Sequence, residues 1–249
     1  MTSKRRGDWA EIEWIDGEGE SQMWRISRSA TLPALGHAQP ILISGRAKHQ
    51  NHIPGSWYSY STAKHIPYFS QLERRWLLMT EFDFDIAAIV SQPFRVHVHE
   101  ADSRVLGYVP DFLVIETSGD MTALEVKPER FDDEQNQRRV QMSTPHLLEC
   151  GIDLQIVHEP DPQTLRNVEF LSHFRRPNLN VVKYRSAIQE LATNEVALSE
   201  IFGSIGPEVV VRPAVFHMLW HRELEVDVAA PLSQTSVVRS KRQLTAAAP

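Results

Sequence analysis

The sequence predicts an α/β domain built on a mixed sheet, followed by a helical domain that ends in a small hairpin. Two observations lead to this fold class. Strand-like and helix-like hydrophobic periods alternate between residues 70 and 157, which is typical of a mixed sheet flanked by helices. After Pro160 helical periods follow one another up to two short strand-like runs, and this order indicates a winged helix-turn-helix domain.

In the first domain, Ser70 and Glu73 have the spacing of a capping box, so we expect a helix from Ser70 to about Glu81. Three strands are expected after it as a meander: residues 94–98, 105–115 and 121–126. Phe112 to Ile115 is continuously apolar, which favours a strand that is covered on both faces.

The polar run 132–139 opens an amphipathic helix that Gly151 can close, and residues 154–157 make a short buried strand. Four helices and a hairpin are expected in the second domain: helices at 165–174, 181–191, 196–202 and 212–222, and strands at 224–228 and 235–238. Pro213 is tolerable in the first turn of the last helix.

These elements divide the chain into four parts: an irregular N-terminal arm packed on the first domain (1–60), the α/β domain (61–164), the winged-helix domain (165–239) and a disordered tail (240–249). The single cysteine, Cys150, excludes an intrachain disulfide and a thiolate zinc cluster. No apolar run reaches the length of a membrane span. We therefore expect a soluble, cytoplasmic protein that does not engage a membrane.

Four residues form the candidate site: Glu73 on the first helix, Asp111 in VPDFLV, and Glu125 and Lys127 in LEVKP. A hairpin around residues 117–120 would set Asp111 beside Glu125 on neighbouring strands. Lys127 would project on the same face as Glu125, because residues i and i+2 of a strand face the same way. Carboxylate oxygens suit Mg²⁺, with Mn²⁺ as a substitute, so this pattern predicts a site for metal-dependent phosphodiester hydrolysis.

Electrostatics sharpen this hypothesis. Two carboxylates held together repel one another, so one of the two pKa values should rise. For Lys127 we expect a depressed pKa that suits deprotonating or orienting water. The net charge of −6 argues against nonspecific binding of duplex DNA, although part of the acidic surplus can lie in a site that a cation neutralises.

Each residue also has a simpler interpretation. Asp111 follows a proline and can be a turn residue, Glu125 and Lys127 can be a surface ion pair, and Glu73 can merely close its capping box. Histidine sets such as His97 with His99, or His49, His52 and His65, are weaker candidates for a metal site, because no full ligand set is evident in the sequence.

A longer context makes the pattern more specific. The pair Pro110-Asp111 with Glu125-Val126-Lys127 resembles the PD-(D/E)xK nuclease superfamily. Leu72-Glu73, VSQPFRV at 90–96, VPDFLV at 109–114 and LEVKP at 124–128 resemble the TnsA endonuclease subunit of heteromeric cut-and-paste transposons. The resemblance continues through RNVEFLSHFRRP and HRELEVDVAAPLS and covers about residues 65–235.

The resemblance implies a restriction-endonuclease-like first domain, with Glu73, Asp111 and Glu125 around the metal and Lys127 beside the scissile phosphate. It implies cleavage of the non-transferred strand at the 5′ ends of the transposon in the bacterial nucleoid. The partners it implies are double-stranded DNA at the transposon ends, a DDE transposase like TnsB and an AAA+ regulator like TnsC.

Two other functions stay open: a free-standing restriction-like or junction-cleaving nuclease, and a noncatalytic transposition adaptor that keeps the fold. The helix at 212–222 carries only Arg212 and Arg222 as fixed positive charges among many apolar residues. We therefore expect the second domain to contact partner proteins rather than DNA. Arg138 and Arg139 are candidates for a DNA backbone contact or for a solvated helix face, and Gln92 has no predicted chemical role.

Overall fold

The structure is a computed structural model and describes residues 8–27, 32–41, 53–83, 85–101, 104–130 and 134–241. Backbone contacts divide the chain into two compact units. The first unit comprises Met1–Leu77 with Phe84–Glu159, and the second comprises Leu78–Asp83 with Pro160–Pro249. Helix α1 (Gln71–Asp83) contributes residues to both units. The predicted domain limits at residues 60, 164 and 239 stay predictions.

An antiparallel N-terminal sheet forms one layer of the first unit, in the order β2-β1-β6-β7. Its strands are β1 (Trp9–Ile15), β2 (Ser21–Arg25), β6 (Arg95–His99) and β7 (Val105–Tyr108). Ala10 and Ile12 alternate with exposed or half-buried neighbours along β1, which is the period of a strand with one buried face. The prediction of irregular structure before residue 60 is wrong, because residues 9–13 of β1 pair with β6.

A mixed central sheet forms the second layer, in the order β10-β9-β8-β5. Its strands are β5 (Ile86–Ser91), β8 (Phe112–Glu116), β9 (Met121–Val126) and β10 (Ile152–Val157). Only β10 pairs in parallel, with β9, and the other pairs are antiparallel. Phe112, Leu113 and Val114 are all buried, so both faces of β8 are covered as predicted. The strand predicted at 154–157 is longer and lies at an edge, with Ile156 47% exposed.

The predicted three-stranded meander is wrong in one respect. The run 105–115 is two strands, β7 and β8, which lie in different sheets. Pro110 stands at the break, where its missing N–H and fixed φ angle end the ladder of β7. A second crossing between the same two sheets follows β5 at Gln92-Pro93. Both changes of sheet are therefore marked by a proline.

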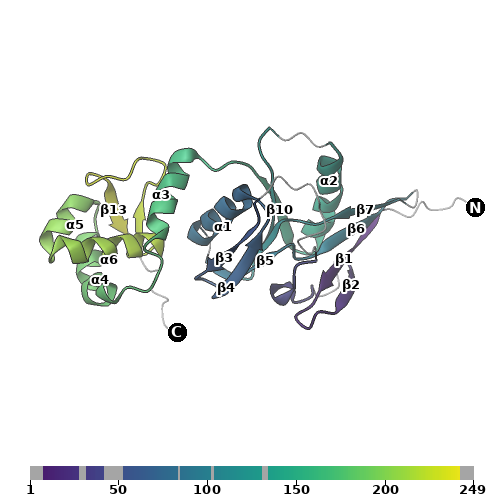
Figure 1. Cartoon of the computed structure of the whole chain (residues 1–249), viewed down its shortest axis with the longest axis horizontal. Helices are drawn as coiled ribbons and strands as arrows, with labels where there is room; N and C mark the ends of the chain where they lie inside the picture. The colour runs from purple at the N-terminus through teal and green to yellow at the C-terminus, as the bar shows by residue number, and fades with distance from the viewer. Residues whose placement is uncertain are drawn as a thin grey trace, which may run out of the picture. The chain divides into compact units, whose positions relative to one another are not determined.

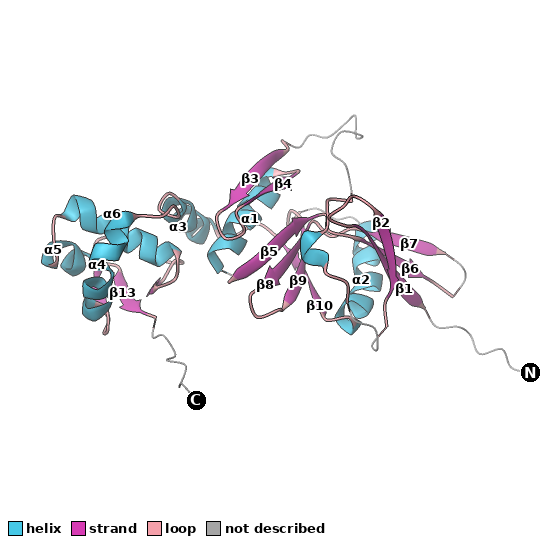
Figure 2. Ribbon diagram, turned by 90° about the horizontal axis from the view of Figure 1, so that it is seen from below, coloured by secondary structure: helices cyan, strands magenta, loops and turns pink. Residues whose placement is uncertain are grey.

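Helix α2 (Glu134–Glu149) lies between the two sheets and contacts β10 on one side and β1, β6 and β7 on the other (Figure 2). Its buried Val140 and Leu147 join the core formed by both sheets. Gly151 follows the helix with φ +83°, and its N–H donates to the carbonyl of Leu148. This left-handed closure confirms the predicted end of the helix.

Three smaller elements complete the first unit: the hairpin β3 (Gly55–Ser59) with β4 (Lys64–Tyr68), and the 3-10 helix η1 (Leu35–His37). Helix α1 starts one residue after Ser70, whose Oγ accepts a hydrogen bond from Glu73 N–H at 3.1 Å. The predicted cap of this helix is confirmed.

The second unit contains the four predicted helices and a three-stranded sheet in the order β11-β13-β12 (Figure 1). Its elements are α3 (Pro162–Ser172), α4 (Leu179–Leu191), β11 (Val196–Ala197), α5 (Leu198–Ser204), α6 (Glu208–Trp220), β12 (Leu224–Val226) and β13 (Val237–Ser240). Helix α6 begins four residues earlier than predicted, so Pro213 lies inside it rather than in its first turn. Ser240 belongs to β13, and the rest of the predicted tail beyond Lys241 lies outside the described residues.

Side chains of α3, α4 and α6 build the core of the second unit, with Val168, Leu171, Val181, Ile188 and Val215 fully or almost fully buried. The buried amide of Asn167 donates to the carbonyls of Val228 and Ala230, both at 2.8 Å. This contact fastens the loop between β12 and β13 to α3. No helix in the described part of the chain is long and apolar enough to cross a membrane.

Candidate active site

Asp111 and Glu125 lie side by side because the hairpin of β8 and β9 has the predicted register. Phe112 is opposite Leu124 in this antiparallel pair, and Asp111 N–H donates to the carbonyl of Leu124 at 3.0 Å. The turn of the hairpin is closed by Gly119 with φ +95°, a conformation that favours glycine. The predicted hairpin is confirmed.

Asp111 stands at the point where the chain passes from the N-terminal sheet to the central sheet. Gln92, at the other crossing, donates its N–H to the carbonyl of Asp111 at 2.8 Å. The Asp111 carboxylate accepts a hydrogen bond from Val126 N–H at 2.8 Å. The main chain of Asp111 is thus held by the residue that follows β5, and its side chain is held by β9. Asp111 itself lies just outside the regular strand β8.

Gln92 holds this position at a conformational cost. Its φ angle is +45°, which is uncommon for a residue with a side chain, and its amide Oε1 is buried without a hydrogen-bond partner among the described residues. The structure therefore gives Gln92, for which the sequence predicted no chemical role, a structural contact with Asp111.

Glu125 is buried, with 2% of its surface exposed, and three donors satisfy its carboxylate. Tyr108 OH donates to Oε2 at 2.9 Å, Asn136 Nδ2 donates to Oε1 at 2.9 Å, and Lys127 Nζ lies 2.9 Å from Oε1. A charge buried to this extent is retained only when its oxygens are paired. Burial of Tyr108 and the neighbouring Glu125 charge hold the pKa of the Tyr108 phenol well above its usual range, so this group stays a donor.

Lys127 faces the same side as Glu125, as predicted from their i and i+2 spacing. The expectation of a depressed Lys127 pKa is wrong. Burial lowers this pKa, but the charges of Glu125 and Asp111 outweigh burial and raise it above its usual value. Lys127 is therefore a permanent cation at neutral pH rather than a general base.

Glu73 is also buried, at 8% exposure, and part of its carboxylate serves the helix cap. Its Oε2 accepts a hydrogen bond from Phe69 N–H at 2.7 Å, one residue before the Ser70 N–H that Glu73 would use in a capping box. The helix that carries Glu73 is tied to the end of the central sheet, because the Trp76 indole N–H donates to the carbonyl of His158.

The pKa of Asp111 depends on all the charged groups of the cluster. Burial and the charges of Glu125 and Glu73 raise its pKa to about 8, and the charge of Lys127 offsets this only in part. The prediction that one carboxylate pKa rises is confirmed. The structure thus brings all four predicted side chains within electrostatic reach, with three carboxylates against one cation.

The carboxylates of the candidate site are suitable ligands for a hard divalent cation, but they are not arranged as a complete coordination shell. Carboxylate oxygens are the donors that Mg²⁺ prefers, and an added positive charge would relieve the repulsion that raises the Asp111 pKa. Among the described residues, no three aspartate, glutamate, histidine or cysteine side chains converge closely enough to hold a metal ion. Lys127 and Asn136 share the Glu125 oxygen that such an ion would otherwise use.

Sequence reasoning missed Tyr108 and Asn136, which orient Glu125. Tyr108 is the last residue of β7 in the other sheet, and Asn136 lies on α2. The alternation in β7 could have indicated a buried Tyr108, but no local pattern connects either residue with Glu125, since the contact depends on the packing of two layers.

The other candidate residues have local partners. His97 Nε2 and His99 Nε2 lie 2.8 Å and 2.9 Å from Glu13 and Glu11, respectively, on the neighbouring strand β1. Arg138, one of the residues considered for a DNA backbone contact, forms an ion pair of 2.8 Å with Glu100. His49 and His52 lie outside the described residues.

In the second unit, helix α6 is enclosed on several sides. It contacts α3, α4 and α5, and its residues from Ala214 to Trp220 are buried except for the half-buried Phe216. The ring of Phe216 lies 5.0 Å from those of Phe170 and Phe174. Arg212 near the start of the helix pairs with Glu208 and covers the ring of Phe202. Little of the positive charge predicted for this helix is therefore available for phosphates.

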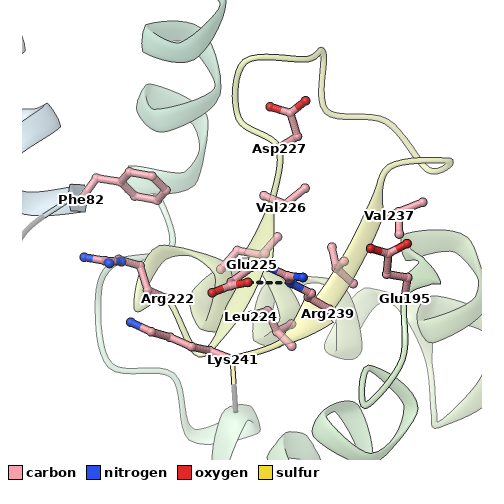
Figure 3. Close-up of a pocket in the computed structure, with 12 residues that line it drawn as sticks. Phe82, Glu195, Arg222, Leu224, Glu225, Val226, Asp227, Val237, Arg239 and Lys241 are labelled. Carbon is pink, nitrogen blue, oxygen red and sulfur yellow. Dashed lines mark hydrogen bonds and ion pairs between the residues drawn. The ribbon is translucent and has the colours of Figure 1, made fainter. Parts of the chain in front are cut away.

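The second unit also contains an open pocket of about 660 Å³, shown in Figure 3. Leu224 and Val226 line it with apolar surface, and an ion pair of 2.7 Å joins Glu225 and Arg239 within it. None of the four predicted site residues lines this pocket. Its balanced charges show no preference for an anion or a cation.

Comparison with known proteins adds no independent assignment to this geometry. Neither the protein-family models nor the curated proteins include a match to the chain.

Proposed function

We propose that this protein is a Mg²⁺-dependent DNA endonuclease and the TnsA-like subunit of a heteromeric transposase. In this proposal it cleaves the non-transferred strand at the 5′ ends of the transposon during cut-and-paste transposition. The observation that carries the proposal is the electrostatic coupling of Glu73, Asp111, Glu125 and Lys127, in which burial and the charges of the neighbouring carboxylates raise the pKa of Asp111 to about 8. Such perturbed groups concentrate at functional sites.

The side chains have separate tasks in this proposal. Asp111, Glu125 and Glu73 would supply the oxygen ligands of a bound cation. A bound divalent cation supplies an activated water and charge neutralisation on the phosphate. Lys127, which stays protonated, orients the scissile phosphate by charge. Tyr108 and Asn136 hold the Glu125 carboxylate in place.

The finer fold assignment belongs to the same proposal. The mixed sheet β10-β9-β8-β5 with α1 and α2 supports a restriction-endonuclease-like first domain. The order helix, short strand, two helices and hairpin, from α4 to β13, supports a winged helix-turn-helix in the second. Helix α6 occupies the place of the recognition helix in that motif.

The enclosure of α6 supports docking on protein partners instead of reading of the major groove. With α3, α4 and α5 packed on it, α6 leaves few side chains for base edges. We propose that a DDE transposase like TnsB and an AAA+ regulator like TnsC bring the DNA ends to this subunit, in the bacterial cytoplasm. The net charge of −6 fits a subunit that does not capture duplex DNA by itself.

A noncatalytic adaptor is the second candidate, and one observation favours it. The Glu125 carboxylate is already satisfied by Tyr108, Asn136 and Lys127, and no three-ligand group is preformed among the described residues. In an adaptor this cluster would act only as a structural network.

One experiment separates these functions. The full chain is combined with its neighbouring transposition proteins, Mg²⁺ and a labelled transposon end, and strand-specific cleavage is measured for wild type and for Asp111→Ala. The proposal expects cleavage of the non-transferred strand by wild type and its loss in the variant, with assembly of the complex unchanged. Equal cleavage by both would leave the adaptor, and efficient cleavage by the purified chain alone would favour a free-standing nuclease.

A further inference from the structure

A small pocket adjoins the carboxylate cluster on the side of α2 and β10. Its volume is about 290 Å³, and Glu125, Lys127, Asn136, Gln141 and His158 are among its lining residues. At about 30 Å³ per water molecule, a volume of this size corresponds to roughly ten water molecules. The candidate site therefore opens into a space that is larger than a single ion requires.

His158 is fixed in this pocket with one ring nitrogen left for a ligand. Its Nδ1 lies 2.9 Å from the main-chain carbonyl of Lys127, and a carbonyl only accepts hydrogen bonds, so Nδ1 carries a proton. The carbonyl of His158 itself accepts from the Trp76 indole. The other ring nitrogen, Nε2, has no hydrogen-bond partner among the described residues.

Lys127 and His158 present nitrogen atoms beside the predicted cleavage site. The Lys127 ammonium has three N–H donors and uses one toward Glu125. On the opposite wall α2 contributes amide side chains, including Gln141, which is exposed. A phosphodiester offers acceptors only, so Nε2 of His158 binds it only when the ring carries a second proton, which the negative charge of the phosphate favours. With that proton in place, His158, the Lys127 cation and the amides of α2 are all nitrogen donors for such a group.

Two apolar side chains complete the pocket. Val140 of α2 and Ile156 of β10 line it, and Ile156 is 47% exposed on the edge strand. A deoxyribose ring has an apolar face that can cover such surface, whereas a free metal ion would gain nothing from it. The mixture of nitrogen donors and small apolar surface therefore matches a sugar-phosphate backbone better than an ion.

We propose that this pocket is a subsite for the DNA strand that is cut, in which the His158 ring, carrying a proton on both nitrogens, donates from Nε2 to a backbone phosphate next to the one beside Lys127. The inference rests on the proposed endonuclease function and deepens it, because it adds a substrate-binding residue and fixes the side from which the strand enters. The strand runs between the edge strand β10 and the first turns of α2.

The first test is binding of inorganic phosphate to the full chain, followed by the nitrogen and carbon-bound proton resonances of the histidine rings. We expect phosphate, with Mg²⁺ present, to shift the His158 ring resonances in a saturable way. His173 is the matched control, because its Nδ1 also contacts a main-chain carbonyl, at 3.1 Å from Phe170 O, but it lies in the second unit. Absence of a shift at His158, or an equal shift at His173, overturns the proposal.

Two variants distinguish ligand binding from structural support. His158→Asn keeps a donor near the position of Nδ1 for the Lys127 carbonyl, whereas His158→Gln places a donor near the position of Nε2. We expect the affinity of the full chain for inorganic phosphate, measured by calorimetry with Mg²⁺ present, to fall about tenfold in His158→Asn. The glutamine variant should retain most of the affinity, and His173→Asn should bind like wild type. Equal affinities for wild type and His158→Asn overturn the subsite.

The outcomes also separate this inference from the proposed function. If Asp111→Ala abolishes cleavage in the assembled reaction while both His158 variants bind and cut like wild type, the endonuclease stands and the subsite falls. If phosphate shifts the His158 resonances but the assembled wild-type protein cuts no strand, the phosphate subsite stands and the endonuclease falls.

Discussion

The two units place their charged side chains differently. In the first, Glu73, Glu125 and Lys127 are buried or half-buried together with Asp111, and the repulsion among the carboxylates is not fully balanced. In the second, the charged pairs Arg185 with Glu223, Arg212 with Glu208 and Arg239 with Glu225 lie on partly or largely exposed surface.

This difference has a physical meaning. Exposed ion pairs contribute little, about 0–1 kcal/mol each, whereas buried like charges are costly unless a function or a bound cation compensates for them. In the second unit aromatic rings pack together instead: Phe170, Phe174 and Phe216 contact one another, and the buried Phe202 contacts Phe216. This difference supports the proposal that places catalysis in the first unit and docking on partners in the second.

The largest expected effect is that of Asp111→Asn on cleavage. We expect a loss of roughly a thousandfold or more in the assembled reaction, because removing a ligand charge from the reacting centre costs about 4 kcal/mol or more of transition-state stabilisation. Strand-specific cleavage of a labelled transposon end measures it. Asp153→Asn is the control, since Asp153 is exposed on β10, and it should cut at the wild-type rate. A similar loss in both variants would contradict a site at Asp111.

The stability of the metal-free chain should depend on pH through the same residue. The folded pKa of Asp111 is raised to about 8 from its usual 3.8, so between these values the folded chain holds a proton that the unfolded chain has lost. Stability is therefore greatest below about pH 4 for this group and falls as pH rises to about 8, by up to about 1.4 kcal/mol per pH unit. Denaturant unfolding of wild type and Asp111→Asn measures the difference.

In this experiment the difference in the free energy of unfolding between wild type and Asp111→Asn, called the gap below, should grow as pH rises to about 8 and then stay constant. Addition of Mg²⁺ should narrow the gap at high pH, where Asp111 is ionised. A gap that is independent of pH between 5 and 8 would contradict the repulsion within the cluster.

Phe216 is half-buried among aromatic rings of the second unit, so Phe216→Ala should lower the free energy of unfolding by about 2 kcal/mol. Its ring contacts Phe170, Phe174 and Phe202. Thermal and denaturant unfolding of the full chain measures the loss. Phe216→Leu should recover much of the lost stability, because it keeps most of the apolar surface. Unchanged stability in the alanine variant would show that this aromatic cluster does not hold α6.

Tyr108→Phe tests the support of Glu125 with a smaller expected effect. The ring stays in the core while the hydrogen bond of 2.9 Å is lost, so we expect cleavage and Mg²⁺ affinity to fall about tenfold to a hundredfold. Stability should fall by only about 1–2 kcal/mol. Tyr184→Phe in the second unit is a control for loss of a tyrosine hydroxyl, and it should leave Mg²⁺ affinity unchanged.

The smallest effect is expected for Arg212→Ala on binding of duplex DNA. Arg212 is engaged with Glu208 and the Phe202 ring, so we expect the affinity of the full chain for a duplex to change by less than about 0.5 kcal/mol. Electrophoretic mobility shift at several salt concentrations measures it. A loss of tenfold or more, with a shallower salt dependence, would identify α6 as a DNA reader.

Much of the fold could be predicted because local signals were strong. The capping box of Ser70 and Glu73, the turn at Gly119 and the closure at Gly151 all act over a few residues, and the corresponding ends are where they were expected. The strand WAEIEWI at 9–15 has clear alternation, so the N-terminal sheet was detectable in principle. Its pairing with β6 was not, since that contact spans more than 80 residues.

By itself, the sequence determined which side chains can take part in the site. The spacing of Asp111, Glu125 and Lys127 around one hairpin follows from strand geometry, and the structure reproduces it. The tertiary structure decided how these groups are tuned. Whether Lys127 has a lowered or a raised pKa depends on the balance between burial and neighbouring charges, and Tyr108, Asn136 and His158 reach the site from other elements. Local geometry acts through a few covalent bonds, whereas electrostatic tuning acts through space between segments that only packing brings together.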